Sequence, residues 1–147
     1  MKNQFIAFAL FVCLISSCKK TTSRALIPNG NYSGVLEVSS SAYKMPFTYP
    51  IAITFENETY KISPDPARKD GGGSGTYVFD GTIGNFNDVN VWKTDFDSNL
   101  ILNGEYEIQS NGNNLVLIKR FKASTQTPPP AVTISQMYYK YILKKSN

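Results

Sequence analysis

The sequence contains no histidine. Without an imidazole the chain can form neither a Ser-His-Asp triad nor a Cys-His pair, and no histidine can act as a general base. Zinc sites with histidine ligands are excluded for the same reason. Catalysis by carboxylates alone stays open, but most of the 11 Asp and Glu residues fall where turns or solvent-facing strand positions would place them. We therefore expect no catalytic residues, no metal site and no cofactor.

Long apolar runs are also missing. The longest, at residues 5–15, is shorter than the about 20 residues that a membrane-spanning helix needs. It follows Lys2 and precedes two small serines, so the three parts of a secretory signal are present. The order Ile15-Ser16-Ser17-Cys18 resembles the bacterial lipobox. The sequence thus predicts a lipoprotein signal peptide over residues 1–17 and lipid attachment at Cys18; an ordinary signal peptide before a coincidental cysteine is the alternative.

Cysteine is scarce, and no disulfide is expected. Cys13 lies inside the apolar run and would leave with it, while Cys18 would be held in a thioether to its lipid. One such cysteine cannot form an intrachain disulfide, even in an oxidising compartment. Acyl chains such as palmitate contribute about 0.8 kcal/mol per buried methylene, and two chains already anchor a protein stably. The expected partner is therefore a membrane, and the fold must rest on its apolar core.

No segment of useful length shows helical periodicity; residues 91–100 could form at most a turn or a short helix. After a tether at residues 18–28, apolar and polar residues alternate in short segments, which is typical of half-buried strands. These segments belong to one domain over residues 29–147. The predicted strands are residues 31–38, 50–56, 59–63, 75–79, 82–88, 100–109, 115–122 and 137–144.

The chain is therefore predicted to be all-β. An even number of antiparallel strands closes most simply into an up-and-down barrel of about eight strands, which leaves no exposed edge. A two-sheet sandwich is the alternative. Asp80-Gly81 predicts a two-residue hairpin turn that pairs Phe79 with Thr82 and places Phe86 on the same face as Phe79. Two long loops rich in Pro or Gly are expected at residues 63–75 and 124–136.

Four segments carry a resemblance to a known family. The chain is similar to small lipocalin-like bacterial lipoproteins, which implies a calycin-type barrel and no agreed ligand or activity. Cysteines of some relatives are missing here, so any property that depends on their disulfides does not carry over. The matching segments are GNYSG at 30–34, WKTDFD at 92–97, ILNGEY at 101–106 and YKYILKK at 139–145.

Inward-facing aromatic residues are the candidates for a ligand pocket. In an eight-stranded barrel they could line a cavity or simply fill the interior. The cluster around Trp92 offers a lid or a ligand-contacting turn, with Asp95 and Asp97 as oxygen donors to a cation such as Ca²⁺. Alternatively Trp92 and Phe96 plug one barrel end while the two Asp residues cap a helical turn. The candidate pocket-lining residues are Tyr60, Tyr77, Phe79, Trp92, Phe96, Tyr106, Tyr139 and Tyr141.

Charge is distributed unevenly, because no acidic residue follows Glu107. The basic residues of this C-terminal part are Lys119, Arg120, Lys122, Lys140, Lys144 and Lys145. Since the last strand of a closed meander lies beside the first, this basic region is predicted to fall near the tether, where it would face anionic lipid heads; a merely solvated strand face is the alternative. In the bacteria that carry the family, lipoproteins exported to the surface tend to have acidic residues after the lipidated cysteine. Here Lys19-Lys20 follows it, so we expect the periplasmic face of the outer membrane of a Gram-negative bacterium.

The expected function is a membrane-anchored, non-enzymatic binding module for a small apolar or amphipathic molecule. The alternative is a protein-interaction or inhibitor module of the cell envelope that acts through its two long loops. Nucleic acid is not an expected partner of an exported lipoprotein, despite the basic charge.

Overall fold

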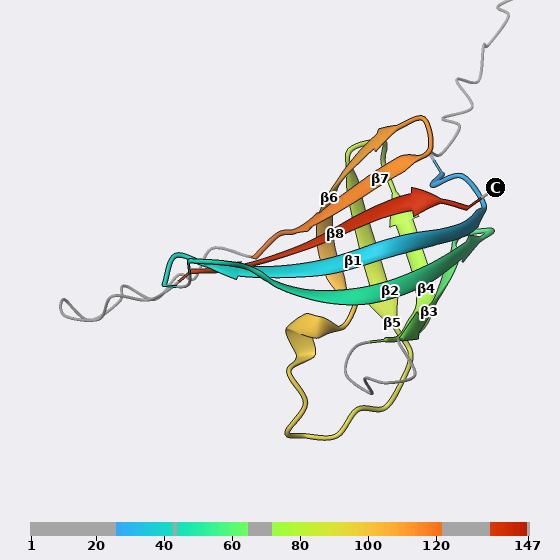
Figure 1. Ribbon diagram of the computed structural model, residues 1–147. Helices are drawn as coiled ribbons and strands as arrows, with labels where there is room; N and C mark the ends of the chain where they lie inside the picture. The colour runs from blue at the N-terminus through green and yellow to red at the C-terminus, as the bar shows by residue number, and fades with distance from the viewer. Residues whose placement is uncertain (1–25, 43, 65–71, 122–135, 147) are drawn as a thin grey trace, which may run out of the picture.

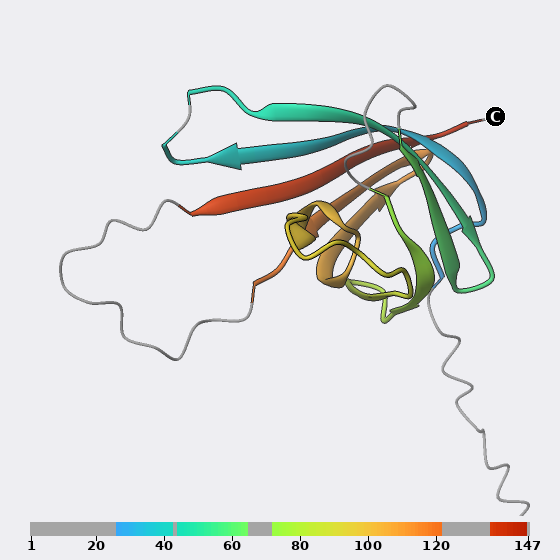
Figure 2. The same ribbon diagram turned by 90° about the horizontal axis from the view of Figure 1, so that it is seen from below.

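Eight strands form the domain. The structure is a computed structural model that describes residues 26–42, 44–64, 72–121 and 136–146. Each strand pairs antiparallel with the next, and the last pairs with the first, so the sheet closes into a barrel (Figure 1, Figure 2). This confirms the predicted all-β up-and-down barrel, and the sandwich alternative is wrong. The strands are β1 (Gly30–Ser40), β2 (Phe47–Glu56), β3 (Thr59–Pro64), β4 (Ser74–Phe79), β5 (Ile83–Asp88), β6 (Gly104–Asn111), β7 (Asn114–Lys119) and β8 (Met137–Lys145).

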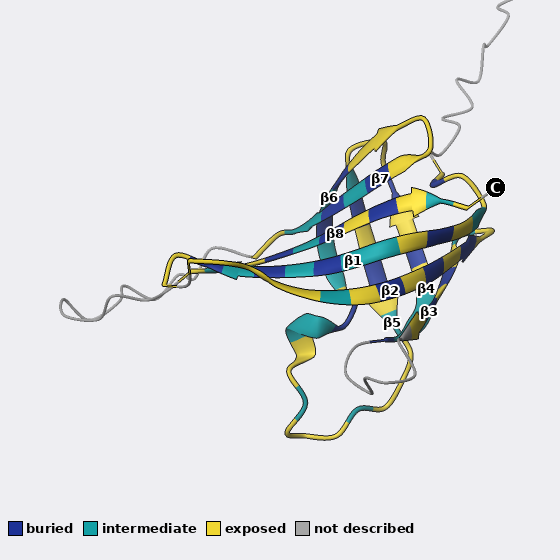
Figure 3. Cartoon of the chain, in the orientation of Figure 1, coloured by how far each residue is buried: buried dark blue, intermediate teal, exposed yellow. Residues whose placement is uncertain are grey.

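The strands form where apolar and polar residues alternate. In β2, Ile51, Ile53 and Phe55 are buried, and the residues between them are exposed. Figure 3 shows this alternation as bands of different burial along the strands. Because successive strand residues point to opposite faces, one face of each strand contributes to a single core inside the barrel.

Gly34 allows the first and last strands to meet. A Cβ at this position would lie 1.9 Å from the carbonyl oxygen of Ile142, far closer than any real contact of this kind. Only glycine therefore permits β1 and β8 to stay paired from Tyr32–Lys145 to Ser40–Met137, which closes the barrel.

Two predicted strands are too long. β6 begins at Gly104 and not at residue 100, because residues 98–100 form the short 3-10 helix η1 (Ser98–Leu100) and residues 101–103 belong to no strand. β7 ends at Lys119 and not at residue 122. Most of the two predicted long loops lies at residues 65–71 and 122–135, outside the described residues.

The predicted pairing of Phe79 with Thr82 is wrong. Phe79 pairs with Gly84 instead. The Asp80 carboxylate accepts hydrogen bonds from the backbone N–H groups of Thr82 and Ile83, at 2.8 and 2.6 Å, and thereby fixes the turn one residue later than expected. The shift in pairing is two residues, so side chains keep their faces, and Phe86 points inward as expected.

The two ends of the barrel differ. At one end the strands are joined by tight turns around residues 57–58, 80–82 and 112–113; we call it the short-turn end. At the opposite end β1 is joined to β2, β3 to β4, β5 to β6 and β7 to β8, and we call it the long-loop end. The described chain starts and finishes at the short-turn end, where Ser146 N–H donates to the carbonyl of Asn31 at 2.7 Å (Figure 1).

Residues 26–28 close the short-turn end. Ile27 is only 1% exposed and belongs to the core. Its carbonyl accepts a hydrogen bond from the Tyr77 hydroxyl at 3.4 Å, and the carbonyl of Pro28 accepts one from the Tyr32 hydroxyl at 2.9 Å. Burying an Ile side chain stabilises a fold by about 1.5 to 3 kcal/mol. The last residues of the predicted tether 18–28 therefore contribute to the barrel.

The structure separates the basic residues of the C-terminal part. Lys144 and Lys145 lie at the short-turn end, beside β1 as predicted. Lys119 and Arg120 lie at the long-loop end, level with the beginning of β8, so the expected single basic region near the tether is wrong for them. The reason is the antiparallel direction of β7 and β8, which places the C-terminal ends of the two strands at opposite ends of the barrel.

Of the helices in the described residues, none has the length and apolar character to cross a membrane.

Candidate functional site

Six of the predicted pocket-lining residues are buried core residues. Phe86, which the sequence analysis did not select, lies at their centre. Its ring centroid is 5.5 Å from those of Tyr60, Tyr77 and Tyr106. Aromatic rings in such contact add about 0.5 to 1.5 kcal/mol per pair beyond the burial of their area. At this level the aromatic side chains pack against one another in the barrel interior. The six residues are Tyr60, Tyr77, Phe79, Tyr106, Tyr139 and Tyr141.

Three tyrosine hydroxyls hold residues 100–102 over the long-loop end of this core. Tyr60 donates to the carbonyl of Leu102 at 2.6 Å, and Tyr106 donates to the carbonyl of Ile101 at 3.2 Å. Tyr141 donates to the carbonyl of Leu100 at 3.4 Å. Leu102 is 0% exposed, so its side chain forms part of the core. We call residues 100–102 the inner segment.

Burial keeps these tyrosines protonated. It raises the pKa of Tyr60, Tyr106 and Tyr141, because the phenolate form would lose its hydration. The negative charge of Asp88 raises the pKa of Tyr60 further. The three hydroxyls therefore act as neutral hydrogen-bond donors to the inner segment.

Trp92 and Phe96 do not form the predicted plug. Both are half-buried and lie outside the core cluster. Their rings stack on each other with centroids 4.9 Å apart. The inner segment closes the long-loop end instead, because Leu102 carries an apolar side chain into the core while tyrosine hydroxyls take up its carbonyls. The sequence analysis placed the closure in nearly the right part of the chain but selected the wrong side chains.

Asp88 connects the two ends of the loop that carries Trp92. One carboxylate oxygen accepts from the Trp92 indole N–H at 2.6 Å. The other accepts from the backbone N–H of Ser74 at 3.0 Å and from the Asn90 side chain at 2.7 Å. The backbone N–H of Asp88 donates to the Asn103 side-chain oxygen at 3.2 Å. The sequence analysis missed this role; the only signal was an acidic residue at the end of a predicted strand.

Asp97 is a helix cap and Asp95 is not. The Asp97 carboxylate accepts from the backbone N–H of Asn99 at 2.9 Å, which makes it the N-cap of η1. It also accepts from the Tyr139 hydroxyl at 3.3 Å. Asp95 is exposed. Within the described residues no group of three or more His, Cys, Asp or Glu side chains could hold a metal ion.

Lys119 lies among aromatic rings at the long-loop end. Its Nζ is 5.7 Å from the ring centroid of Tyr106, 5.8 Å from that of Tyr139 and 5.9 Å from that of Phe121. Burial lowers the pKa of Lys119, and the charge of Asp97 partly offsets this shift. The sequence analysis counted Lys119 among the basic surface residues. The alternation of Leu115, Leu117 and Lys119 could have placed it on the inner face. We call Lys119 and the three rings the Lys119 cluster.

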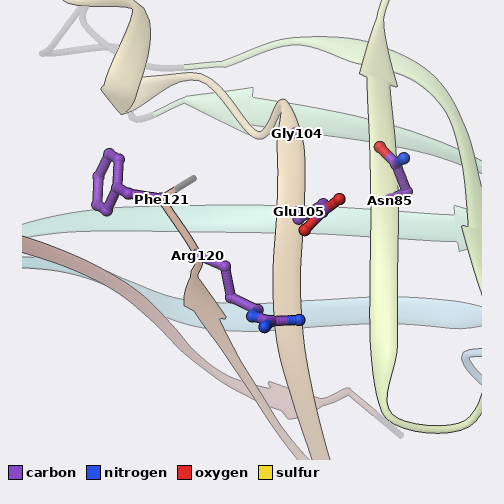
Figure 4. Close-up of a pocket in the computed structure, with 5 residues that line it drawn as sticks. All are labelled: Asn85, Gly104, Glu105, Arg120 and Phe121. Atoms are coloured by element: carbon purple, nitrogen blue, oxygen red, sulfur yellow. The ribbon is translucent and has the colours of Figure 1, made fainter. Parts of the chain in front are cut away.

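A groove of about 250 Å³ lies beside this cluster, on the outer wall of the barrel. Asn85 and Glu105 form a residue pair of β5 and β6 and line the groove together with Gly104, Arg120 and Phe121 (Figure 4). Phe121 also contacts Tyr139, with ring centroids 6.0 Å apart. The groove and the Lys119 cluster thus share Phe121, and none of the predicted pocket-lining residues lines the groove.

The predicted lipid-attachment residue, Cys18, lies outside the described residues.

Comparisons with protein-family models, with curated proteins and with solved structures find no match for the chain. The resemblance to lipocalin-like lipoproteins therefore stays a prediction from the sequence.

Proposed function

We propose that the protein is a membrane-anchored, non-enzymatic binding module of the lipocalin-like type, which takes up a small apolar or amphipathic molecule at the long-loop end of its barrel. The membrane anchor is the lipid on Cys18, and the location is the periplasmic face of the outer membrane. The signal at residues 1–18 supports the anchor, and the eight-stranded barrel supports the kind of module.

The apolar side chains exposed at the long-loop end are the observation that carries this proposal. Met45 is 77% exposed, Val91 98% and Phe121 50%, and Phe47 and Val89 are exposed as well. Phe47 begins β2, and the other four come from three separate connections between strands. The half-buried stack of Trp92 on Phe96 lies in one of these connections. Large apolar side chains exposed at one end of a soluble domain are candidates for a binding surface.

The interior supports binding at this end and not deep inside the barrel. Tyr60, Tyr106 and Tyr141 occupy the level below the inner segment, and their hydroxyls are already bonded to backbone carbonyls. A ligand that entered this space would have to leave those carbonyls without partners, which costs about 1 to 3 kcal/mol for each buried group. The long-loop side of the inner segment carries no such cost.

The neutral fluorescent probe N-phenyl-1-naphthylamine tests the proposal. We would use residues 18–147 with Cys18→Ser, which retain every residue that the structure describes. A rise in probe fluorescence that saturates with a Kd on the order of 10 μM is expected. Phe121→Ser should weaken binding at least threefold. Val78→Ser is the matched control, because Val78 is similarly exposed but lies on the outer wall.

The second candidate is a protein-interaction or inhibitor module of the envelope. The aromatic packing inside the barrel favours it, because a filled barrel leaves its ends and loops as the binding surface. The predicted loops 63–75 and 124–136 lie mostly outside the described residues. If the naphthylamine does not bind to a correctly folded protein, the small-molecule proposal is wrong and this candidate takes its place.

A further inference from the structure

The charge of Lys119 lacks a counter-charge in direct contact. Lys119 continues the inward-facing series Leu115 and Leu117 of β7, so its side chain lies on the inner face of the sheet at the long-loop end. Within the described parts of the chain, none of the hydrogen bonds and ion pairs involves its Nζ. Lys140, by contrast, pairs with Glu37 at 3.0 Å.

The neighbours of Lys119 are aromatic rings and one carboxylate that already accepts other hydrogen bonds. The rings of Tyr106, Tyr139 and Phe121 lie 5.7 to 5.9 Å from Nζ. Such contacts stabilise a cation by about 0.5 to 2 kcal/mol each but leave its N–H groups without acceptors. Asp97 is the nearby negative charge, and its oxygens already accept from Asn99 and from the Tyr139 hydroxyl.

The cost of this arrangement points to a binding role. A partly buried ammonium is less stable than an exposed one, and an apolar residue of similar length could contact the same rings without that cost. The cation gains most when an external anion reaches it, because an ammonium–carboxylate hydrogen bond in partly dehydrated surroundings is stronger than one in water.

We propose that Lys119 Nζ binds the carboxylate of an amphipathic ligand whose apolar part lies against Phe121 at the long-loop end. This inference rests on the proposed function and names its ligand class. Lys119 supplies one positive charge and Asp97 supplies a negative charge nearby, so a ligand with a single negative charge fits this site better than a dianion. A phosphate dianion would place two negative charges beside Asp97 with only one lysine to balance them.

Displacement of N-phenyl-1-naphthylamine by two ligands of equal chain length is the test. In the same chain with Cys18→Ser, dodecanoate should displace the probe at concentrations at least tenfold lower than dodecan-1-ol. A purely apolar site gives the opposite order, because the carboxylate loses more hydration than the alcohol. Lys119→Met should weaken the binding of dodecanoate at least tenfold more than that of dodecan-1-ol, whereas Lys119→Arg should retain the preference for dodecanoate.

Lys144→Met is the matched control, because Lys144 is an exposed lysine at the other end of the barrel. This variant should change the affinity for neither dodecanoate nor dodecan-1-ol. The inference is overturned if dodecan-1-ol displaces the probe as well as dodecanoate does, or if Lys119→Met leaves dodecanoate unaffected; the proposed function then still stands on the binding of the probe. If the probe itself does not bind, the proposed function fails and this inference fails with it.

Discussion

The indole N–H of Trp92 donates a hydrogen bond of 2.6 Å to the carboxylate of Asp88. Asp88 ends β5, and Trp92 lies four residues further along the loop, so the bond folds the first part of this loop back onto the strand. The stack of Trp92 on Phe96 then extends the order along the loop. Trp92 thus organises a loop of the long-loop end and does not fill the core.

Replacing Trp92 should have a moderate effect on stability. Trp92→Ala removes a hydrogen bond to a charged group and one ring stack on a half-buried surface, and should lower the free energy of unfolding by about 1 to 2 kcal/mol. Phe86→Ala, in the centre of the core, should cost about 3 to 5 kcal/mol. Urea unfolding measures both. Equal losses for the two variants would restore the plug interpretation of Trp92.

The two neighbouring aspartates should behave differently. Asp97→Ala removes the cap of η1 and the acceptor of the Tyr139 hydroxyl, so we expect a loss of about 0.5 to 2 kcal/mol. Asp95→Ala changes an exposed side chain and should stay within about 0.5 kcal/mol of the wild type. Thermal melts with and without Ca²⁺ should show no stabilisation by the ion. A Ca²⁺-dependent rise in Tm that both variants lose would instead indicate a cation site.

Ile27 should be part of the folding unit. Ile27→Ala creates a cavity at the short-turn end, and a loss of about 2 to 5 kcal/mol is expected. Leu26→Ala is the control, since Leu26 is half exposed and should contribute less than about 1 kcal/mol. Chemical denaturation of the two variants would decide the matter. Similar small losses would mean that residues 26–28 belong to the tether alone.

Stability should fall at alkaline pH. Tyr60, Tyr106 and Tyr141 have raised pKa values in the folded state, so their contribution is complete below the unfolded value near 10 and is lost as pH rises above it. Lys119 acts in the opposite direction because its folded pKa lies below 10.5, but it is one group against three. The urea midpoint should therefore drop between about pH 9 and about pH 11. A constant midpoint over this interval would contradict the burial of these hydroxyls.

Cys18→Ser should release the protein from membranes. The variant lacks the thiol that would carry the acyl chains, and without them the remaining basic residues contribute only about 1 kcal/mol each at an anionic surface. Fractionation of cells that express the wild type and the variant measures the change. Cys13→Ser is the control, because Cys13 lies in the segment that is expected to be removed. Retention of the Cys18 variant in the membrane fraction would argue against a lipid anchor.

The barrel could be predicted from the sequence because period-two alternation sets the face of every strand residue. That parity survived even where the pairing was wrong, as at Phe79 and Phe86. The inner segment was predicted as strand because Leu100 and Leu102 also alternate. Its carbonyls are held by tyrosines about 40 residues away or only a few residues away, and a local pattern contains no trace of such contacts.

Lys119 was missed for a different reason. The alternation of β7 places Lys119 on the inner face, but a charged residue is usually assigned to the surface. Only the three rings around Nζ show that the side chain lies on the inner face. Ile27 was assigned to the tether because residues 19–28 show no alternation. A single buried residue outside any strand produces no periodic signal.

The position of residues 26–28 determines how the barrel would stand on a membrane. A lipid on Cys18 would hold the short-turn end, since Leu26 is the eighth residue after Cys18 and the extended chain between them reaches about 28 Å at most. Lys119 lies near the beginning of β8, about 20 Å along that strand from Lys145. The proposed carboxylate site would thus lie at the barrel end opposite the tether. When the short-turn end rests on the bilayer, the site opens toward the aqueous compartment and its ligand arrives by diffusion through water, not by sideways exchange from the bilayer.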